Sequence, residues 1–229
     1  YDGKVDLNGE MNYDIQVRID SATGAERRLH QGEFANLRKT RVDVNISGTS
    51  LEKIKGSVVV QDLVYQEGTI DFKLDSLNLD IRRNQESDSV TLSSEYLELN
   101  LTGKFDLLHL WPVVQHQLAR VADNAIDDVD ITKSQNKFFN LKVNLKDVNP
   151  LMQFVDTNIY VAEESRIYAA YDLDDLELQI DLSSDSVLYE EMLFSNIQLT
   201  SYFDSVRANI QYQIEEIHIS DSLGVSNAA

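Results

Sequence analysis

Apolar and polar residues alternate with a period of two along most of the chain. The alternation is clearest in eight segments, at residues 11–19, 42–46, 70–74, 77–81, 97–101, 141–145, 176–182 and 206–214. Successive side chains of a β-strand point to opposite faces of a sheet, so this pattern predicts strands with one dry and one solvated face. Turn-type residues separate the segments, for example at 47–50, 84–88 and 183–186. The short spacing predicts roughly sixteen strands in antiparallel meanders, and therefore an all-β fold.

One segment departs from this alternation and has helical spacing instead. Its apolar residues are Val114, Leu118, Val121 and Ala125, and Pro112 stands where a first helical turn tolerates proline. We expect one amphipathic helix near residues 112–125, packed against the sheet or across its open side. Binding to a membrane surface is the weaker interpretation, because the polar face carries a single cation, Arg120.

Two parts of the chain align with each other at an offset of about 98 residues. The matching segments are 44–46 with 143–145, 77–81 with 176–180, 87–90 with 184–187, and 101–106 with 199–204. We therefore divide the chain into leading strands at 1–35, a first β repeat at 36–134 that carries the helix, and a second β repeat at 135–229. Stacked β repeats cover each other's sheet edges, so this organisation predicts an elongated molecule.

The composition narrows the range of partners. Against 39 Asp and Glu there are only 20 Lys and Arg, which gives a formal charge of −19. Nucleic acids and anionic membranes attract proteins through Lys and Arg, so nucleic acid is not expected as a partner. The chain has no cysteine, which excludes disulfides and Cys-ligated metals. A hydrophobic content of 42% argues for a folded chain.

Catalytic and metal-binding motifs are absent from the sequence. It contains no nucleophile elbow, Walker motif, dinucleotide-binding motif or zinc-protease motif. The acidic run at Asp123, Asp127, Asp128 and Asp130 resembles a calcium loop only in charge, since it lacks the required glycine and terminal glutamate. We therefore expect a protein that is not an enzyme, with no catalytic residues, no metal and no cofactor.

Two features suggest that the chain is an internal fragment of a longer protein. It begins at Tyr1 within a strand-like pattern, without an initiator methionine or a signal peptide. It also contains no run of 18 apolar residues that could form a transmembrane helix. Any membrane anchor is therefore expected outside this segment.

Several strand-and-turn patterns are similar to those of a known family. Segments 56–65, 75–79, 89–97 and 101–107 resemble the TamB-like translocation and assembly proteins of Gram-negative bacteria, and the similarity extends over about residues 42 to 214. These patterns are degenerate, because they describe strands and turns rather than a catalytic signature.

The resemblance implies a fold and a function. It implies a member of the AsmA-like superfamily with a bridge-like lipid transfer architecture, in which a long β-sheet curls into a trough, or repeating β-groove. Such a protein lies in the periplasm, is anchored at the inner membrane by a segment absent here, and carries phospholipid acyl chains between the two membranes. It also implies a role in outer-membrane protein assembly, with an outer-membrane β-barrel assembly protein as a partner through missing C-terminal regions.

The trough interpretation assigns a set of apolar side chains to the lipid-binding groove. They are Leu77, Leu79, Ile81, Leu97, Leu99, Leu101, Leu141, Val143, Leu145, Leu176, Leu178, Ile180, Ile210 and Ile214. The alternative is a structural or adhesive β-solenoid in which the same side chains form a closed, protein-filled core. Alternation is identical in the two cases, so the pattern of residues alone leaves both open.

Overall fold

Nearly all regular structure lies in one antiparallel sheet. The computed structural model describes residues 2–6, 12–23, 36–49, 53–67, 70–119, 137–154, 156 and 158–219. Within these residues fourteen strands form a single sheet in which each pair of neighbours is antiparallel. The predicted all-β, antiparallel fold is therefore confirmed.

The strands follow each other in the sheet almost in sequence order. Their bounds are β1 Asp2–Asp6, β2 Asn12–Thr23, β3 Asn36–Ser47, β4 Lys55–Glu67, β5 Ile70–Arg82, β6 Asp88–Ser94, β7 Leu97–Lys104, β8 Phe138–Leu145, β9 Ile159–Val161, β10 Ser165–Asp172, β11 Glu177–Tyr189, β12 Met192–Phe203, β13 Ala208–Gln213 and β14 Glu216–Ile219. Strands β1 to β8 are consecutive neighbours, followed by β10 to β13, while β9 pairs with β11 and β14 with β12.

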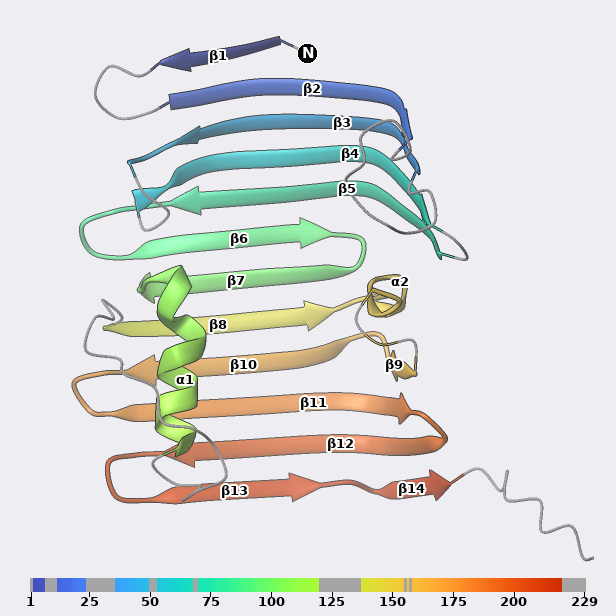
Figure 1. Cartoon of the computed structure of the whole chain (residues 1–229). Coiled ribbons are helices and arrows are strands. Elements are labelled where there is room, and N and C mark those ends of the chain that lie inside the picture. The colour runs from blue at the N-terminus through green and yellow to red at the C-terminus, as the bar shows by residue number, and fades with distance from the viewer. Residues whose placement is uncertain are drawn as a thin grey trace, which may run out of the picture.

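The sheet is an elongated, curled trough. Figure 1 shows the strands stacked from β1 at one edge to β13 at the other, with the right-hand ends of β2 to β5 bent out of the plane of the sheet. The helix α1 (Leu110–Ala119) lies across one face, near the opposite ends of β7 to β12. Twelve consecutive strands at a spacing of ~4.8 Å extend over about 53 Å. The long axis of the trough is therefore perpendicular to the strands.

A break in the alternation marks the bend. In β4 the positions that are opposite apolar residues of β5 change from even numbers, at Val58 and Val60, to odd numbers, at Leu63 and Tyr65. Asp62, between them, has φ 54°, in the left-handed region, and is skipped in the register with β5. A residue in this conformation turns the strand and changes the face to which the following side chains point. The segments 70–74 and 77–81, predicted as separate strands, are for the same reason two arms of the continuous strand β5.

The helix and one turn differ from their predicted positions. The helix α1 begins at Leu110, two residues before Pro112, and the predicted part after Ala119 lies outside the described residues. The turn predicted at 183–186 is wrong, because these residues lie within β11. Ser184 donates a hydrogen bond to the carbonyl oxygen of Ser186 at 2.9 Å, so its hydroxyl is satisfied in an extended strand. The short helix α2 (Asn149–Met152) follows β8.

The sheet is continuous across the boundary between the two proposed repeats. Strand β7 from the first repeat pairs with β8 from the second, from Leu97↔Leu145 to Lys104↔Phe138. The aligned segments 87–90 and 184–187 occupy different places: the first enters β6 after a turn, and the second lies inside β11. The division of the chain at residue 135 stays a prediction.

Candidate functional site

A continuous row of apolar side chains crosses the sheet perpendicular to its strands. Residues directly opposite each other on neighbouring strands point to the same face. The registers join one residue from each of eleven strands, which we call the open row: Ile15, Val44, Val58, Leu79, Leu92, Leu99, Val143, Ile167, Leu182, Leu199 and Tyr212. All of them except the exposed Tyr212 are half-buried. Their row therefore forms a long apolar surface that is only partly covered.

A parallel strip on the same face is fully covered by α1. We call it the closed strip, and it consists of Phe139, Tyr171, Leu178 and Phe203, which are directly opposite one another in the register. Leu178 is 0% exposed, and Val113 of α1, in the same cluster, is 1% exposed. The rings of Phe139 and Tyr171 are stacked with centroids 5.6 Å apart. The helix and four strands thus form an ordinary protein core here.

Buried serines on the apolar face direct their hydroxyl groups to the backbone. Ser201 donates to the carbonyl oxygen of Ile180 at 3.0 Å. The Oγ atoms of Ser184 and Ser165 lie 2.7 Å apart, and Ser165 donates to the carbonyl oxygen of Ala162 at 2.6 Å. Placing an unpaired hydroxyl in an apolar medium costs free energy, and these contacts remove that cost. These buried serines are therefore satisfied within the protein and leave no unpaired hydroxyl group on the apolar face.

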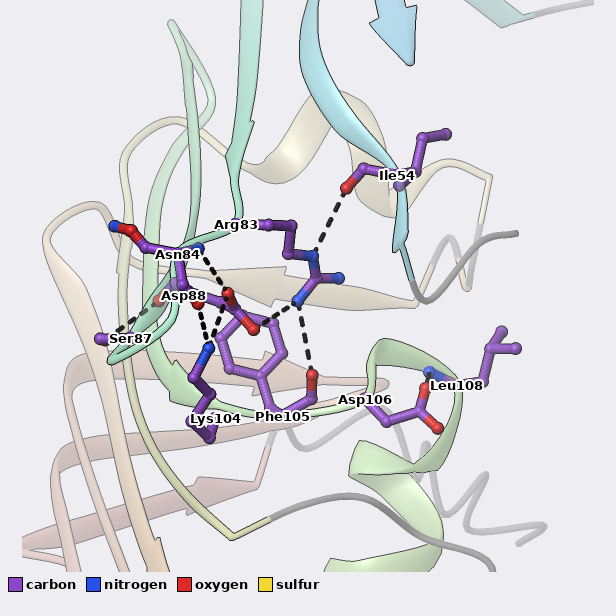
Figure 2. A network of polar contacts seen from close by, with 9 residues as sticks. All are labelled: Ile54, Arg83, Asn84, Ser87, Asp88, Lys104, Phe105, Asp106 and Leu108. Atoms are coloured by element: carbon purple, nitrogen blue, oxygen red, sulfur yellow. Dashed lines mark hydrogen bonds and ion pairs between the residues drawn. The ribbon is translucent and has the colours of Figure 1, made fainter. Parts of the chain in front are cut away.

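A charged cluster terminates the closed strip (Figure 2). Asp88 is buried opposite Gly103, which in turn is opposite Phe139. Its carboxylate accepts from Arg83 Nη1 at 3.2 Å and from Lys104 Nζ at 3.3 Å. Two cations offset the cost of burying one carboxylate, so the cluster has a clear structural role.

The same cluster holds the segment that leads into α1. The guanidinium of Arg83 lies 5.2 Å from the ring centroid of Phe105 and donates to the carbonyl oxygen of Phe105 at 3.4 Å. The next residue, Asp106, accepts from the backbone N–H of Leu108 at 3.0 Å and lies 2.5 Å from Nδ1 of His109. It caps the 3-10 turn Leu107–His109 and so fixes the start of α1.

Aromatic rings cluster at the bent ends of β4 and β5, away from α1. Phe154, which follows α2, packs against Tyr65 and Phe72 on the bent ends of β4 and β5, at centroid distances of 5.8 and 5.2 Å. Phe72 also contacts Tyr96, whose hydroxyl donates to the carbonyl oxygen of Lys73. Burial raises the pKa of Tyr96, and neighbouring carboxylates, first Glu95, raise it further. The face that carries the open row is therefore bordered by α1 near one end of β7 to β12, and by these aromatic rings at the bent ends of β4 and β5.

The structure brings most of the predicted groove residues onto one face, but not into one environment. The register places twelve of them there: Leu77, Leu79, Ile81, Leu97, Leu99, Leu101, Leu141, Val143, Leu145, Leu178, Ile180 and Ile210. Leu101 and Leu178 belong to the core under α1, whereas Leu99 and Val143 lie in the open row. Leu176 lies in the turn before β11, with φ 55°, and Ile214 lies between β13 and β14.

Only three of the eleven open-row residues, Leu79, Leu99 and Val143, belong to the groove set predicted from the sequence. The eight that were not predicted are Ile15, Val44, Val58, Leu92, Ile167, Leu182, Leu199 and Tyr212. Leu182 belongs to a clear alternation and could have been chosen. Ile167 is harder to identify, because β10 has Ser165 and Ala169 as its neighbours on the same face and an aromatic residue, Tyr168, on the other. Only the pairing of strands reveals that these residues form one row.

Metal ligation and membrane spanning find no support in the part of the chain that the structure describes. No group of three or more His, Cys, Asp or Glu side chains is arranged there to hold a metal ion. No helix among those residues is both long and apolar enough to cross a bilayer. The acidic run from Asp123 to Asp130 lies outside the described residues.

Comparison with known proteins gives no match to a protein family, a curated protein or a solved structure.

Proposed function

We propose that this chain is a segment of a bridge-like protein that shields phospholipid acyl chains in an apolar trough. The observation that carries the proposal is the open row. Ten of its eleven side chains are half-buried, and they follow one another without a polar interruption from β2 to β13. A soluble protein rarely leaves such a long apolar surface uncovered unless the surface binds something.

The dimensions of the open row suit acyl chains that lie along the trough. Eleven strands at a spacing of ~4.8 Å give a row about 48 Å long. The hydrocarbon core of a bilayer is ~30 Å thick and contains two layers of acyl chains, so the row exceeds the length of one extended chain. Acyl chains need apolar contact and no catalytic group, which agrees with the apolar side chains and satisfied serines of this face.

The resemblance to TamB-like proteins supports the wider setting of the proposal. In that setting the parent protein lies in the periplasm, is anchored at the inner membrane, and serves phospholipid transport between the membranes, outer-membrane protein assembly, or both. A periplasmic position is also compatible with a formal charge of −19, which disfavours binding along an anionic membrane surface.

A second candidate is a structural β-solenoid without lipid. The closed strip favours this function, because α1 fills that part of the face with protein side chains such as Val113. Protein side chains would fill the whole face if other parts of the parent protein covered the open row.

Quantitative mass spectrometry of extracted lipid tests the proposal. Leu182→Arg places a charge on the open row, and Asn78→Arg places the same charge on the exposed polar face of β5. We expect phospholipid to copurify with the wild type and with Asn78→Arg, and to be largely lost from a folded Leu182→Arg. A wild type without lipid, or a Leu182→Arg variant that keeps its lipid, would refute the proposal.

A further inference from the structure

A second groove runs across the sheet at the level of the open row. It has a volume of about 660 Å³ and crosses β6, β7, β8, β10, β11 and β12. Each strand contributes three consecutive residues centred on the open row, such as 142–144 in β8 and 166–168 in β10. Six neighbouring strands at a spacing of ~4.8 Å make the groove about 24 Å long.

The groove lies on the polar face of the sheet, opposite the apolar trough. Alternate residues of a strand point to opposite faces, so the outer two residues of each triplet project from the polar face. The residues two positions away on the apolar face, such as Leu141 and Leu145, do not line it. The groove is therefore bounded by two rows of polar side chains, and its floor is the backbone of the open-row residues.

Two cations without ionic partners lie near the middle of the groove. Lys142 on β8 and Arg166 on β10 are both exposed, and neither forms an ion pair within the described part of the chain. The lining also contains two acidic residues: Glu98 is paired with Lys146 at 2.7 Å, and Asp181 accepts a hydrogen bond from Gln179. Three donors on lysine and five on arginine are thus available to a carboxylate.

The groove also contains hydrogen-bond acceptors without a partner. Oδ1 of Asn144 and Oδ1 of Asp181 are buried and accept no hydrogen bond from the residues that the structure describes. The other atoms of these groups are engaged, since Gln179 donates to Asp181 Oδ2 at 2.7 Å and Asn144 donates to Glu164 at 3.5 Å. An unsatisfied buried acceptor is costly, and a ligand hydroxyl could satisfy it once a neighbouring exposed side chain moves.

Aromatic rings accompany these polar groups. Tyr168 lies in the lining beside Lys142 and donates to Oδ1 of Asn140 at 3.2 Å. Asn140 also lines a smaller neighbouring groove of about 190 Å³, with Phe138 and Tyr202. Phe138 and Tyr202 are both exposed. This part of the polar face therefore combines flat apolar rings with donors and acceptors.

We propose that this groove binds an acidic oligosaccharide, with carboxylate groups held by Lys142 and Arg166. Sugars offer hydroxyl groups that both donate and accept, and C–H faces that pack on aromatic rings. An extended peptide fits less well, because its backbone groups would need free backbone partners, and the groove crosses strands that are already paired. The site is on the face opposite the open row and does not depend on lipid binding.

Isothermal titration calorimetry with the full chain and tetragalacturonate, an acidic tetrasaccharide, tests the site. We expect the wild type to bind it, and Arg166→Gln and Lys142→Gln each to weaken binding by about tenfold or more, because each removes a charge-assisted hydrogen bond. The matched control is Arg82→Gln, since Arg82 is exposed on β5 and outside the groove. We expect this variant to bind like the wild type.

Two further ligands decide the chemical class. We expect neutral cellotetraose and the acidic peptide tetraglutamate to bind at least tenfold more weakly than tetragalacturonate. Absence of tetragalacturonate binding, equal loss in Arg82→Gln, or tetraglutamate binding as tight as that of the sugar would overturn the proposal. Thermal unfolding followed by circular dichroism establishes that each variant is folded, and Lys142→Arg, which keeps the charge, should restore most of the binding lost in Lys142→Gln.

Discussion

Leu178 and Leu182 show how two regions of one apolar face can differ. Both are leucines of β11, and their side chains point to the same face four residues apart. Leu178 is 0% exposed because α1 covers the closed strip, whereas Leu182 is half-buried in the open row. The strand is the same in both places, so the difference comes from what packs on it. A dry strand face therefore need not be a filled core.

The two regions also differ in how their ends are held. The closed strip ends in the buried Asp88, with Arg83 and Lys104 as partners, and this cluster connects the strands to the segment before α1. The open row has no such closure among the described residues and runs on from strand to strand. We expect the closed strip to provide most of the stability and the open row to be free for binding.

Truncation of the two leucines should give the largest contrast. Leu178→Ala removes a fully packed side chain, and such changes lower the free energy of unfolding by about 2–5 kcal/mol. Leu182→Ala should cost about 1 kcal/mol or less, because less packed surface is lost. Urea unfolding followed by circular dichroism measures both values. Equal losses would mean that the two regions are packed alike.

A glycine near the closed strip should be the next most sensitive position. Gly103 has φ +142°, and a Cβ atom there would lie 2.2 Å from the carbonyl oxygen of Phe138. Gly103→Ala should therefore lower the free energy of unfolding by about 1–3 kcal/mol, since the strained backbone cannot move away from its paired strand. Thr102→Ala, in the same strand, is the control. If both variants unfold at the same urea concentration, the close approach of β7 and β8 is not as described.

Neutralising Asp88 should lower the free energy of unfolding by a similar amount. Asp88→Asn removes the charge that pairs with Arg83 and Lys104, at a cost of about 1–3 kcal/mol, because the pairs are largely shielded from water. The control is Asp80→Asn, whose partner Arg82 has a side chain that is 74% exposed. Such surface pairs contribute ~0–1 kcal/mol. Thermal unfolding of both variants at low and high salt measures the difference between the two sites. An equal effect of the two substitutions would contradict the stronger pairing of Asp88.

The smallest expected effect is a change in the pKa of Tyr202, which lies on the polar face. The hydroxyl of Tyr202 donates to the carboxylate of Glu177, and this hydrogen bond is the main reason that the pKa of Tyr202 is raised to about 12. Because the pKa is raised in the folded state, the protonated hydroxyl stabilises that state. This stabilisation is fully present below pH ~10 and is lost as the pH rises through about 12. Ultraviolet difference spectroscopy should show the pKa falling toward 10.0 in Glu177→Gln. An unchanged titration would exclude this contact.

The sequence was sufficient to predict the strands but not the cover over them. Alternation at Leu97, Leu99 and Leu101 correctly indicates β7 and its dry face. It cannot indicate that Leu101 is buried while Leu99 lies in the open row, because this depends on α1 residues such as Val113 that follow after a turn. Cover is a tertiary property, and the period of a strand contains no information about it.

Local chemistry also explains the turn that was wrongly predicted. The residue types at 183–186 predict a turn, because serine and aspartate side chains often form hydrogen bonds to nearby backbone groups in turns. In β11 the hydroxyl of Ser184 instead contacts Ser165 and Ser186. The contact with Ser165 comes from a partner 19 residues away, which a reading of single segments cannot anticipate.

Site-specific photo-crosslinking in living bacteria tests the open row most directly. A photoreactive phenylalanine at Leu182 would point to the apolar face, and the same residue at Ser183 would point to the polar face one position later. We expect phospholipid adducts, identified by mass spectrometry of the purified protein, from position 182 and not from position 183. Adducts only to protein at position 182, or equal lipid adducts at both positions, would contradict a lipid-filled trough.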